Sequence, residues 1–543
     1  MAAVFSGEPT VAGRILGPIE RSVYRICLID PREEMHWKKY SIALISLSVW
    51  GFLLTLLMQV MQSVLPLNPQ GLPNVGWALA FNTAASFVTN TNWQSYSGEA
   101  TLGYFVQMFG LTVQNFLSAA TGMAVLLVIA RALTRQKTNE LGNFWVDLVR
   151  CTLYLLLPLS VLFGLVLVSQ GVVQNFLAYV SSTSLEGVDH LLPMGPAASQ
   201  IAIKQLGTNG GGFFGANSAH PFENPSALSN FLQMLAILII PSAQLYAFGV
   251  LAKARKHALV IYFVMFAILI CALFVGLWSE AQGNPALGLA SQLEGKEIRF
   301  GAGNSILWSV LTTAASNGSV NAALDSLSPL AGGVAFLQIA LGEVVFGGVG
   351  AGVYGMFLFV LLTVFLAGLM VGRTPEYLGK KLEGFEMKWA LVAIIGPSAA
   401  VLLLGAATVI AMPSISSVLN QGPLGLGGPH GLSEIMYAYA SAAQNNGSAF
   451  GGFPTDSALL NVVLGLTMLF GRFIVILSVL AICGALVEKR IIPPSQGTFS
   501  TETPIFAVLL FATILIIGAL TFVPVMSLSS IVEHFLMLSG RTF

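Results

Sequence analysis

The chain has few charged residues and no net charge. Only 9% of its 543 residues are Asp, Glu, Lys or Arg, with 24 acids against 24 bases, whereas soluble domains carry roughly 25% charged residues. The charge balance leaves no basic field of the kind that attracts a nucleic acid. Because 55% of the residues are hydrophobic, the composition predicts a polytopic membrane protein that contacts lipids and binds no nucleic acid.

Cysteines are few and catalytic motifs are missing. The four cysteines lie far apart, without a C-x-x-C or Cys/His cluster, which is typical of small buried apolar residues (Cys27, Cys151, Cys271 and Cys483). P-type pumps take phosphate on an Asp followed by Lys-Thr-Gly, and no Asp of this chain precedes a lysine. Walker, H-E-x-x-H and G-x-S-x-G motifs are absent too. We therefore expect no catalysis by the chain itself, and an intramembrane hydrolase would have neither nucleophile nor metal ligands.

A short polar motif recurs four times. Each copy has a polar residue, then Asn, then Gly or Thr, and the third positions are separated by 119, 108 and 129 residues: Thr89-Asn90-Thr91, Thr208-Asn209-Gly210, Ser316-Asn317-Gly318 and Asn445-Asn446-Gly447. A single Asn-Gly pair usually marks a turn. Four copies at near-equal spacing indicate an internal repeat, and we interpret them as four pore loops.

The apolar segments repeat with the same period. In each pass a long apolar run, a short apolar run, the motif and a second long run follow one another, as in 41–64, 77–88, 89–91 and 102–129. The short runs of the other three passes are 197–206, 305–315 and 433–443. The short runs cannot span a membrane, which takes about 20 residues. We predict an all-α polytopic fold with four M1-P-M2 repeats around a pseudo-fourfold axis. The predicted boundaries are a cytoplasmic amphipathic flank at 1–40, repeats at 41–150, 151–258, 259–388 and 389–490, and a linker with an additional C-terminal transmembrane helix at 491–543.

The basic residues predict the orientation. Nineteen of the 24 Lys and Arg residues fall in segments on the side opposite the motifs, and such residues concentrate in short cytoplasmic loops. The N-terminus is therefore expected in the cytoplasm and the short helices are expected to enter from outside. Lys204 and Arg472 are left at membrane depth.

The motifs have the chemistry of a site for a monovalent cation. Non-helical backbone is tolerated within a membrane only where it is buried in protein or lines a cavity, and backbone carbonyls there can replace an ion's water shell. No motif contains a carboxylate, which Ca²⁺ and Mg²⁺ prefer. Potassium is the favoured ion on this ground, and sodium stays open.

Six stretches resemble one transporter family: TNTNWQSYSGE at 89–99, LGTNGGGFF at 206–214, HPFENP at 220–225, GEVVFGGVG at 342–350, GRTPEYLGKK at 372–381 and NNGSAF at 445–450. They are similar to the potassium-binding A subunit of the Kdp-type potassium-transporting ATPase. The resemblance implies the fold of the superfamily of potassium transporters and a place in the bacterial plasma membrane. It also implies a channel-like subunit that binds external K⁺ and delivers it through an intramembrane tunnel to a P-type ATPase subunit.

The resemblance further implies partners and site residues. The partners would be that P-type ATPase subunit (KdpB-like), which uses ATP, and small accessory subunits (KdpC-like and KdpF-like), with no covalent cofactor on this chain. The family's filter column falls on Thr91, Gly210, Gly318 and Gly447. The predicted K⁺ filter comprises Thr89, Asn90, Thr91, Gln94, Thr208, Asn209, Gly210, Ser316, Asn317, Gly318, Asn445, Asn446 and Gly447.

The predicted gate lies in a segment that is too long for one straight crossing. Residues 330–370 contain Glu343 and the small residues Gly347, Gly348 and Gly350, which indicate either close helix packing or a broken helix of the kind that transporters use beside an ion path. The second interpretation matches the family's gating loop beneath the filter.

Arg472 is expected about 22 Å into a helix that starts near residue 458, at ~1.5 Å per residue. A charge at that depth is costly and often functional. It either pairs with a carboxylate such as Glu343 or forms a positive barrier below the filter.

Two further sets of residues have open roles. Lys204 and Asp325 are either pore charges or loop anchors, and His220 with Glu223 indicates a loop lock more than a metal site. A free-standing potassium transporter of the Trk, Ktr or HKT kind remains the alternative function. The additional C-terminal helix and the six stretches favour the Kdp type.

Overall fold

The computed structural model describes residues 1–8, 11–290, 292–342, 344–372, 374–411, 428–455, 457–493 and 498–541. Within these ranges, nine helical segments are long and apolar enough to cross a membrane. They are α3 (Trp37–Val60), Val106–Thr134 with α6 (Val113–Thr134), Phe144–Ser169 with α7 (Phe144–Cys151) and α8 (Leu157–Ser169), α10 (Ala227–Leu251), α11 (Arg255–Glu280), α14 (Ala351–Val371), α15 (Gly384–Ala411), α18 (Ala458–Glu488) and α19 (Pro504–Leu528).

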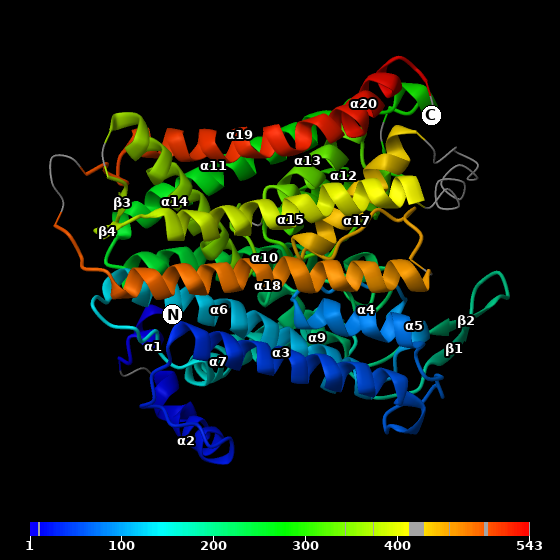
Figure 1. Cartoon of the computed structure of the whole chain (residues 1–543). Coiled ribbons are helices and arrows are strands. Elements are labelled where there is room, and N and C mark those ends of the chain that lie inside the picture. Colours follow the sequence, from blue (N-terminus) through cyan, green and yellow to red (C-terminus); the bar gives the residue numbers. More distant parts are fainter. Residues whose placement is uncertain are drawn as a thin grey trace.

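The long helices lie side by side and give the molecule two ends (Figure 1). The N-terminus with α1 (Ala2–Phe5) and the hairpin of β3 (Glu376–Tyr377) and β4 (Lys380–Lys381) lie at one end, with α2 (Val11–Ile26) beside them. The hairpin of β1 (Val180–Thr183) and β2 (Asp189–Leu192) lies at the other end with α20 (Ser530–Leu538). The mostly helical membrane fold is confirmed, and the two antiparallel hairpins are small additions to the predicted all-α pattern.

Four short helices precede the four motifs. They are α4 (Trp77–Val88), α9 (Ala197–Leu206), α12 (Gly301–Ala314) and α17 (Pro429–Ala443). The first two match the predicted short segments, whereas α12 and α17 each begin four residues earlier than the apolar runs at 305–315 and 433–443. In α17 the early start follows from Pro429, because proline fits the first turn of a helix, where its missing N–H needs no partner. The arrangement is consistent with M1-P-M2 repeats, whose boundaries stay a prediction.

The burial of the helices separates an inner group from an outer one. The segment Val106–Thr134 and α14 are mostly buried, whereas fewer than a third of the residues in the spanning parts of α3, α15 and α19 are fully buried. Since exposed apolar surface of this extent suits lipid, the outer group is the membrane-facing layer. The motifs therefore lie inside a shell of long helices.

The segment at 330–370 is broken into two helices. The residues described between α13 (Pro329–Ala340) and α14, 341–342 and 344–350, are irregular, and Phe346, Gly347 and Gly350 have positive φ angles of 61°, 64° and 81°. The break and the close packing expected of this segment are both present, and its role as a gate stays a prediction. The helix is interrupted, and its small residues also allow close contact, because a Cβ on Gly350 would overlap the Gly122 carbonyl of α6. Glu343 lies outside the described residues.

A candidate potassium site

The four motif loops leave their helices in the same way. In each loop the third residue after the helix end donates its backbone N–H to the carbonyl five residues earlier, at 2.9 Å in every case: Thr91 to Ser86, Asn209 to Lys204, Asn317 to Thr312 and Asn446 to Ser441. This shared bond turns the chain sharply at the carboxyl end of each short helix. It also fixes which residues of the four loops correspond.

In the first loop, this correspondence moves the predicted filter position from Thr91 to the next residue. Two positions in each loop have positive φ angles. They are the second residue after the helix end (Asn90, Thr208, Ser316 and Asn445) and the fourth (Asn92, Gly210, Gly318 and Gly447). Asn92, and not Thr91, therefore occupies the position of the three glycines. The sequence alone paired Thr89-Asn90 with Thr208-Asn209 because the residue types match. However, α4 ends directly before Thr89, whereas α9 ends two residues before Thr208, so the true correspondence is shifted by one residue.

The three column glycines are needed where the loops touch. A Cβ on Gly210 would overlap the carbonyl oxygen of Asn317, one on Gly318 that of Asn446, and one on Gly447 that of Thr91. Each glycine therefore packs directly against the backbone of the next loop. Since their φ angles of 79°, 79° and 97° also disfavour side chains, both space and backbone conformation select glycine.

Side-chain amides join neighbouring loops into a closed ring. Asn90 Nδ2 donates to the Thr208 carbonyl at 3.0 Å, and Asn317 Nδ2 donates to the Lys204 carbonyl at 3.0 Å. Asn446 Nδ2 donates to the Thr312 carbonyl at 3.1 Å. Asn445 Nδ2 then reaches Thr91 Oγ1 at 2.9 Å and links the fourth loop to the first. Each loop thus has a bond to both neighbours.

Further polar contacts stiffen the individual loops. Gln94 and Gly212 exchange two hydrogen bonds of 2.9 and 2.8 Å between the first and second loops. The Asn317 side chain accepts the backbone N–H of Ser319 at 3.1 Å, and Asn446 accepts that of Ser448 at 3.0 Å. Asn92, Ser319 and Ser448 were not among the predicted site residues, although the Asn-Gly-Ser shared by the third and fourth loops is visible in the sequence.

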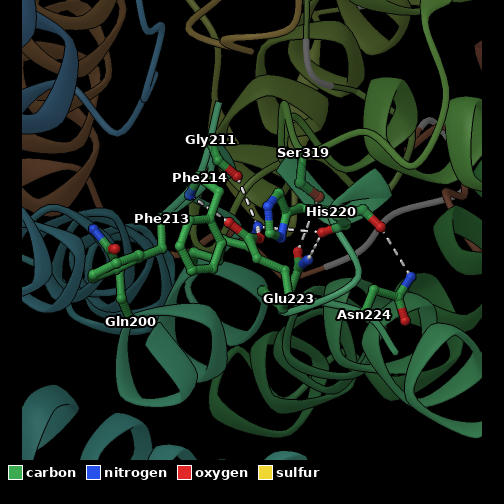
Figure 2. A network of polar contacts seen from close by, with 12 residues as sticks. Gln200, Gly211, Phe213, Phe214, His220, Glu223, Asn224 and Ser319 are labelled. Atoms are coloured by element: carbon green, nitrogen blue, oxygen red, sulfur yellow. Dashed lines mark hydrogen bonds and ion pairs between the residues drawn. The ribbon is translucent and has the colours of Figure 1, made fainter. Parts of the chain in front are cut away.

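A buried ion pair lies behind the second loop. The Lys204 ammonium contacts Glu223 Oε2 at 2.5 Å and donates to the Gly211 carbonyl at 2.8 Å, and both side chains are almost fully buried. Glu223 also accepts the backbone N–H of Phe214 at 2.9 Å, so that Gly211, Phe214 and Glu223 lie together in Figure 2. His220 stacks on Phe214 with ring centroids 4.3 Å apart. These contacts are those of a loop anchor and a loop lock.

The irregular chain between α13 and α14 is tied to the ring. Val349 donates its backbone N–H to Thr208 Oγ1 at 2.7 Å, and Gly347 donates to the carbonyl of Ala314, at the end of α12, at 3.1 Å. Gly350 donates to Gln244 Oε1 of α10 at 2.6 Å. The described residues of this loop, 341–342 and 344–350, therefore form the wall next to the motif residues, and Gly347, Gly348 and Gly350 of the predicted gate lie in it.

Arg472 of α18 is buried beside the same loop. Its Nη1 donates to the Tyr354 hydroxyl at 2.9 Å, while its Nη2 is buried and has no hydrogen-bond partner among the described residues. It lines a cavity of about 50 Å³ with Tyr354, Gln444 and Asn445, which is room for more than one water molecule. No described carboxylate pairs with Arg472, and pairing with Glu343 lies outside the described residues.

The chain matches a protein-family model over almost its whole length. The model of the family described as "Potassium-transporting ATPase A subunit" matches residues 1–535. The chain belongs to this family. Among curated relatives, the "Potassium-transporting ATPase potassium-binding subunit" of Pseudomonas fluorescens (strain Pf0-1) is 54% identical over 536 residues, which covers 98% of this chain and 94% of the relative. That of Rhodospirillum centenum is 54% identical over 549 residues, covering 100% and 95%.

A solved structure shares the fold at low identity. The potassium transporter TrkH from Vibrio parahaemolyticus matches with a TM-score of 0.51 and 15% identity, over 82% of this chain and 84% of TrkH. This likeness concerns the fold alone. As a member of the potassium-transporting ATPase A subunit family, the chain is a multi-pass bacterial membrane protein that takes part in potassium transport, and the predictions of family, fold class and plasma-membrane location are confirmed.

Proposed function

We propose that this chain is the subunit that binds external K⁺ in an ATP-driven uptake complex, and that the ring of four loops is its filter. The closed ring carries the proposal, because it holds four stretches of non-helical backbone together inside a shell of long helices. Its oxygens come from carbonyls, amides and hydroxyls, which suit a weakly hydrated monovalent cation. The relatives' names, which describe a potassium-binding subunit, agree with this assignment.

The ion's exit is proposed to run sideways. Below Asn445 the cavity beside Arg472 is also lined by Ile517, Gly518 and Thr521 of α19, so open space lies toward the additional C-terminal helix. A fixed positive charge at Arg472 opposes a straight path to the cytoplasm. We propose that the ion passes to a P-type ATPase subunit, which binds ATP, while small accessory subunits complete the complex.

A substitution in the ring tests the filter assignment. Gly210→Ala places a methyl group against the Asn317 carbonyl at a φ of 79°, and we expect at least about a tenfold loss of apparent K⁺ affinity, equivalent to about 1.4 kcal/mol. The measurement is K⁺-stimulated ATP hydrolysis by the complex, with Rb⁺ and Na⁺ as competitors.

The matched control is Gly303→Ala in α12, where a Cβ meets no atom within 4 Å. It should keep wild-type affinity and selectivity. If Gly210→Ala also kept both while remaining folded, the ring would not be the filter.

A further inference from the structure

Four ionisable side chains gather on the same side of the molecule as the motif loops, away from the ring itself. His430 and Glu434 lie one turn apart on α17, Asp325 lies in the turn Leu324–Ser326 after the third motif, and Glu533 lies on α20. Three elements far apart in sequence therefore meet at this cluster. None of these groups has a role in the proposed filter.

The imidazole of His430 is held between two carboxylates. Its Nδ1 lies 2.8 Å from Glu533 Oε1, and its Nε2 lies 3.0 Å from Asp325 Oδ1 and 3.9 Å from Glu434 Oε1. One oxygen of Asp325, one of Glu434 and a ring nitrogen of His430 all lie within 4.8 Å of one another. Ligands of a tetrahedral metal ion with bonds of about 2.0–2.1 Å stand about 3.3 Å apart, so small side-chain shifts would complete a coordination shell.

Glu434 is the observation that points to a ligand. Its side chain is fully buried, and neither carboxylate oxygen accepts a hydrogen bond from a described residue. A buried carboxylate without donors is costly, because it has lost water and gained no replacement. Among the described residues, His430 is the one cationic side chain within ion-pair distance of Asp325, Glu434 or Glu533, so a single imidazole faces three carboxyl groups.

We propose that Asp325, His430 Nε2 and Glu434 bind one divalent transition-metal ion of the zinc class, with Glu533 accepting the Nδ1–H of His430. A carboxylate on the far nitrogen is the usual support of a metal-bound histidine, because it fixes the ring and its tautomer. The histidine nitrogen favours Zn²⁺ over Ca²⁺ and Mg²⁺, which prefer oxygen ligands. One His and two carboxylates leave a fourth position for water.

The ion would fasten three elements together beside the fourth motif loop. The His430 ring stacks on Phe450 with centroids 6.1 Å apart, and Phe450 follows Gly447 closely in sequence. The bound metal therefore joins the chain after the third motif, the start of α17 and α20 into one unit.

Zinc binding to the full-length chain tests the site. The protein is stripped with a chelator in detergent and titrated calorimetrically with ZnCl₂, with metal content measured after gel filtration. We expect one zinc per chain and a higher Tm with Zn²⁺ but not with CaCl₂ or MgCl₂. His430→Gln and Glu434→Gln should abolish the site, and Glu533→Gln should weaken zinc affinity about 10–100-fold.

The control variant is His190→Gln, in the exposed strand β2, which should bind zinc like the wild type. A Co²⁺ spectrum of the wild-type chain reports tetrahedral coordination independently of whether the variants fold. Equal zinc affinity in Glu434→Gln and wild type would overturn the proposal. So would a wild-type chain that binds no zinc, since His430 would then be a charged bridge between carboxylates.

Discussion

At the scale of single residues, the motif asparagines work through their side chains as much as through their backbone. Asn317 donates to a carbonyl near the end of α9, and Asn446 donates to one near the end of α12. Each side chain also accepts the N–H of a serine in its own loop. One amide thus satisfies groups on both sides of a junction between loops. Thr91 holds the corresponding place in the first loop and cannot donate an amide there, so that Asn445 supplies the link instead.

Arg472 should act as a barrier to ion leak. A unit charge about 4 Å from a passing cation costs about 4 kcal/mol at an effective dielectric of 20, close to a thousandfold in rate. Arg472→Gln should therefore allow K⁺ to cross the membrane of liposomes that contain the complex without ATP. The Tm of the complex is measured alongside this flux. If Arg472 only paired with Glu343, the single variant would lose stability without leaking, and Arg472→Gln with Glu343→Gln would restore it.

The pair of Lys204 and Glu223 should matter for stability more than for ion binding. Lys204→Met leaves Glu223 buried and uncompensated, and we expect a loss of about 3–5 kcal/mol. The measurement is denaturant unfolding of the purified chain. Lys204→Met combined with Glu223→Gln removes both charges and should recover most of the loss. A double variant as unstable as the single one would contradict the anchor role.

At the scale of elements, a side chain of the ring holds the break between α13 and α14 in place. Thr208 Oγ1 accepts the N–H of Val349, so a residue of the second motif holds the wall beneath it. This bond ties the backbone of the broken segment directly to the second motif loop. The segment was recognisable from its length and its glycines, but its partner was not.

Removing that hydroxyl should loosen the broken segment. Thr208→Val keeps the shape of the side chain and leaves the Val349 N–H buried without an acceptor, which costs about 1–3 kcal/mol. We expect faster amide hydrogen exchange in peptides that cover 344–350. Thr467→Val is the control, because among the described residues that hydroxyl bonds only the carbonyl one turn back in α18. Unchanged exchange at Val349 in Thr208→Val would show that the bond does not hold the loop.

At the scale of the whole molecule, we expect the chain to provide a path for K⁺ and no catalytic step. Its helices surround a ring of neutral oxygens, and its sequence has no Asp-Lys-Thr-Gly or Walker motif. The relatives' names describe one subunit of a potassium-transporting ATPase. Energy would then come from another subunit.

We expect the purified chain to hydrolyse no ATP. Addition of a P-type ATPase subunit and the small subunits should give K⁺-stimulated hydrolysis, followed as phosphate release. A partner with its phosphorylated Asp changed to Asn is the control and should abolish the activity. Hydrolysis by this chain alone, persisting after removal of any co-purifying ATPase, would overturn the division of labour.

The sequence by itself determined the class of the protein, its long and short helices and the four motifs, because burial in a membrane demands long apolar runs and an interrupted run is visible as such. It could not determine that Asn92 occupies the position that glycine holds in the other three loops. That position depends on where α4 ends and not on the similarity of residue types. Nor could it show that Lys204 pairs with Glu223, or that Asp325, His430, Glu434 and Glu533 meet. Some of these contacts join residues more than a hundred positions apart in the sequence. Only the packing of the helices decides which side chains touch.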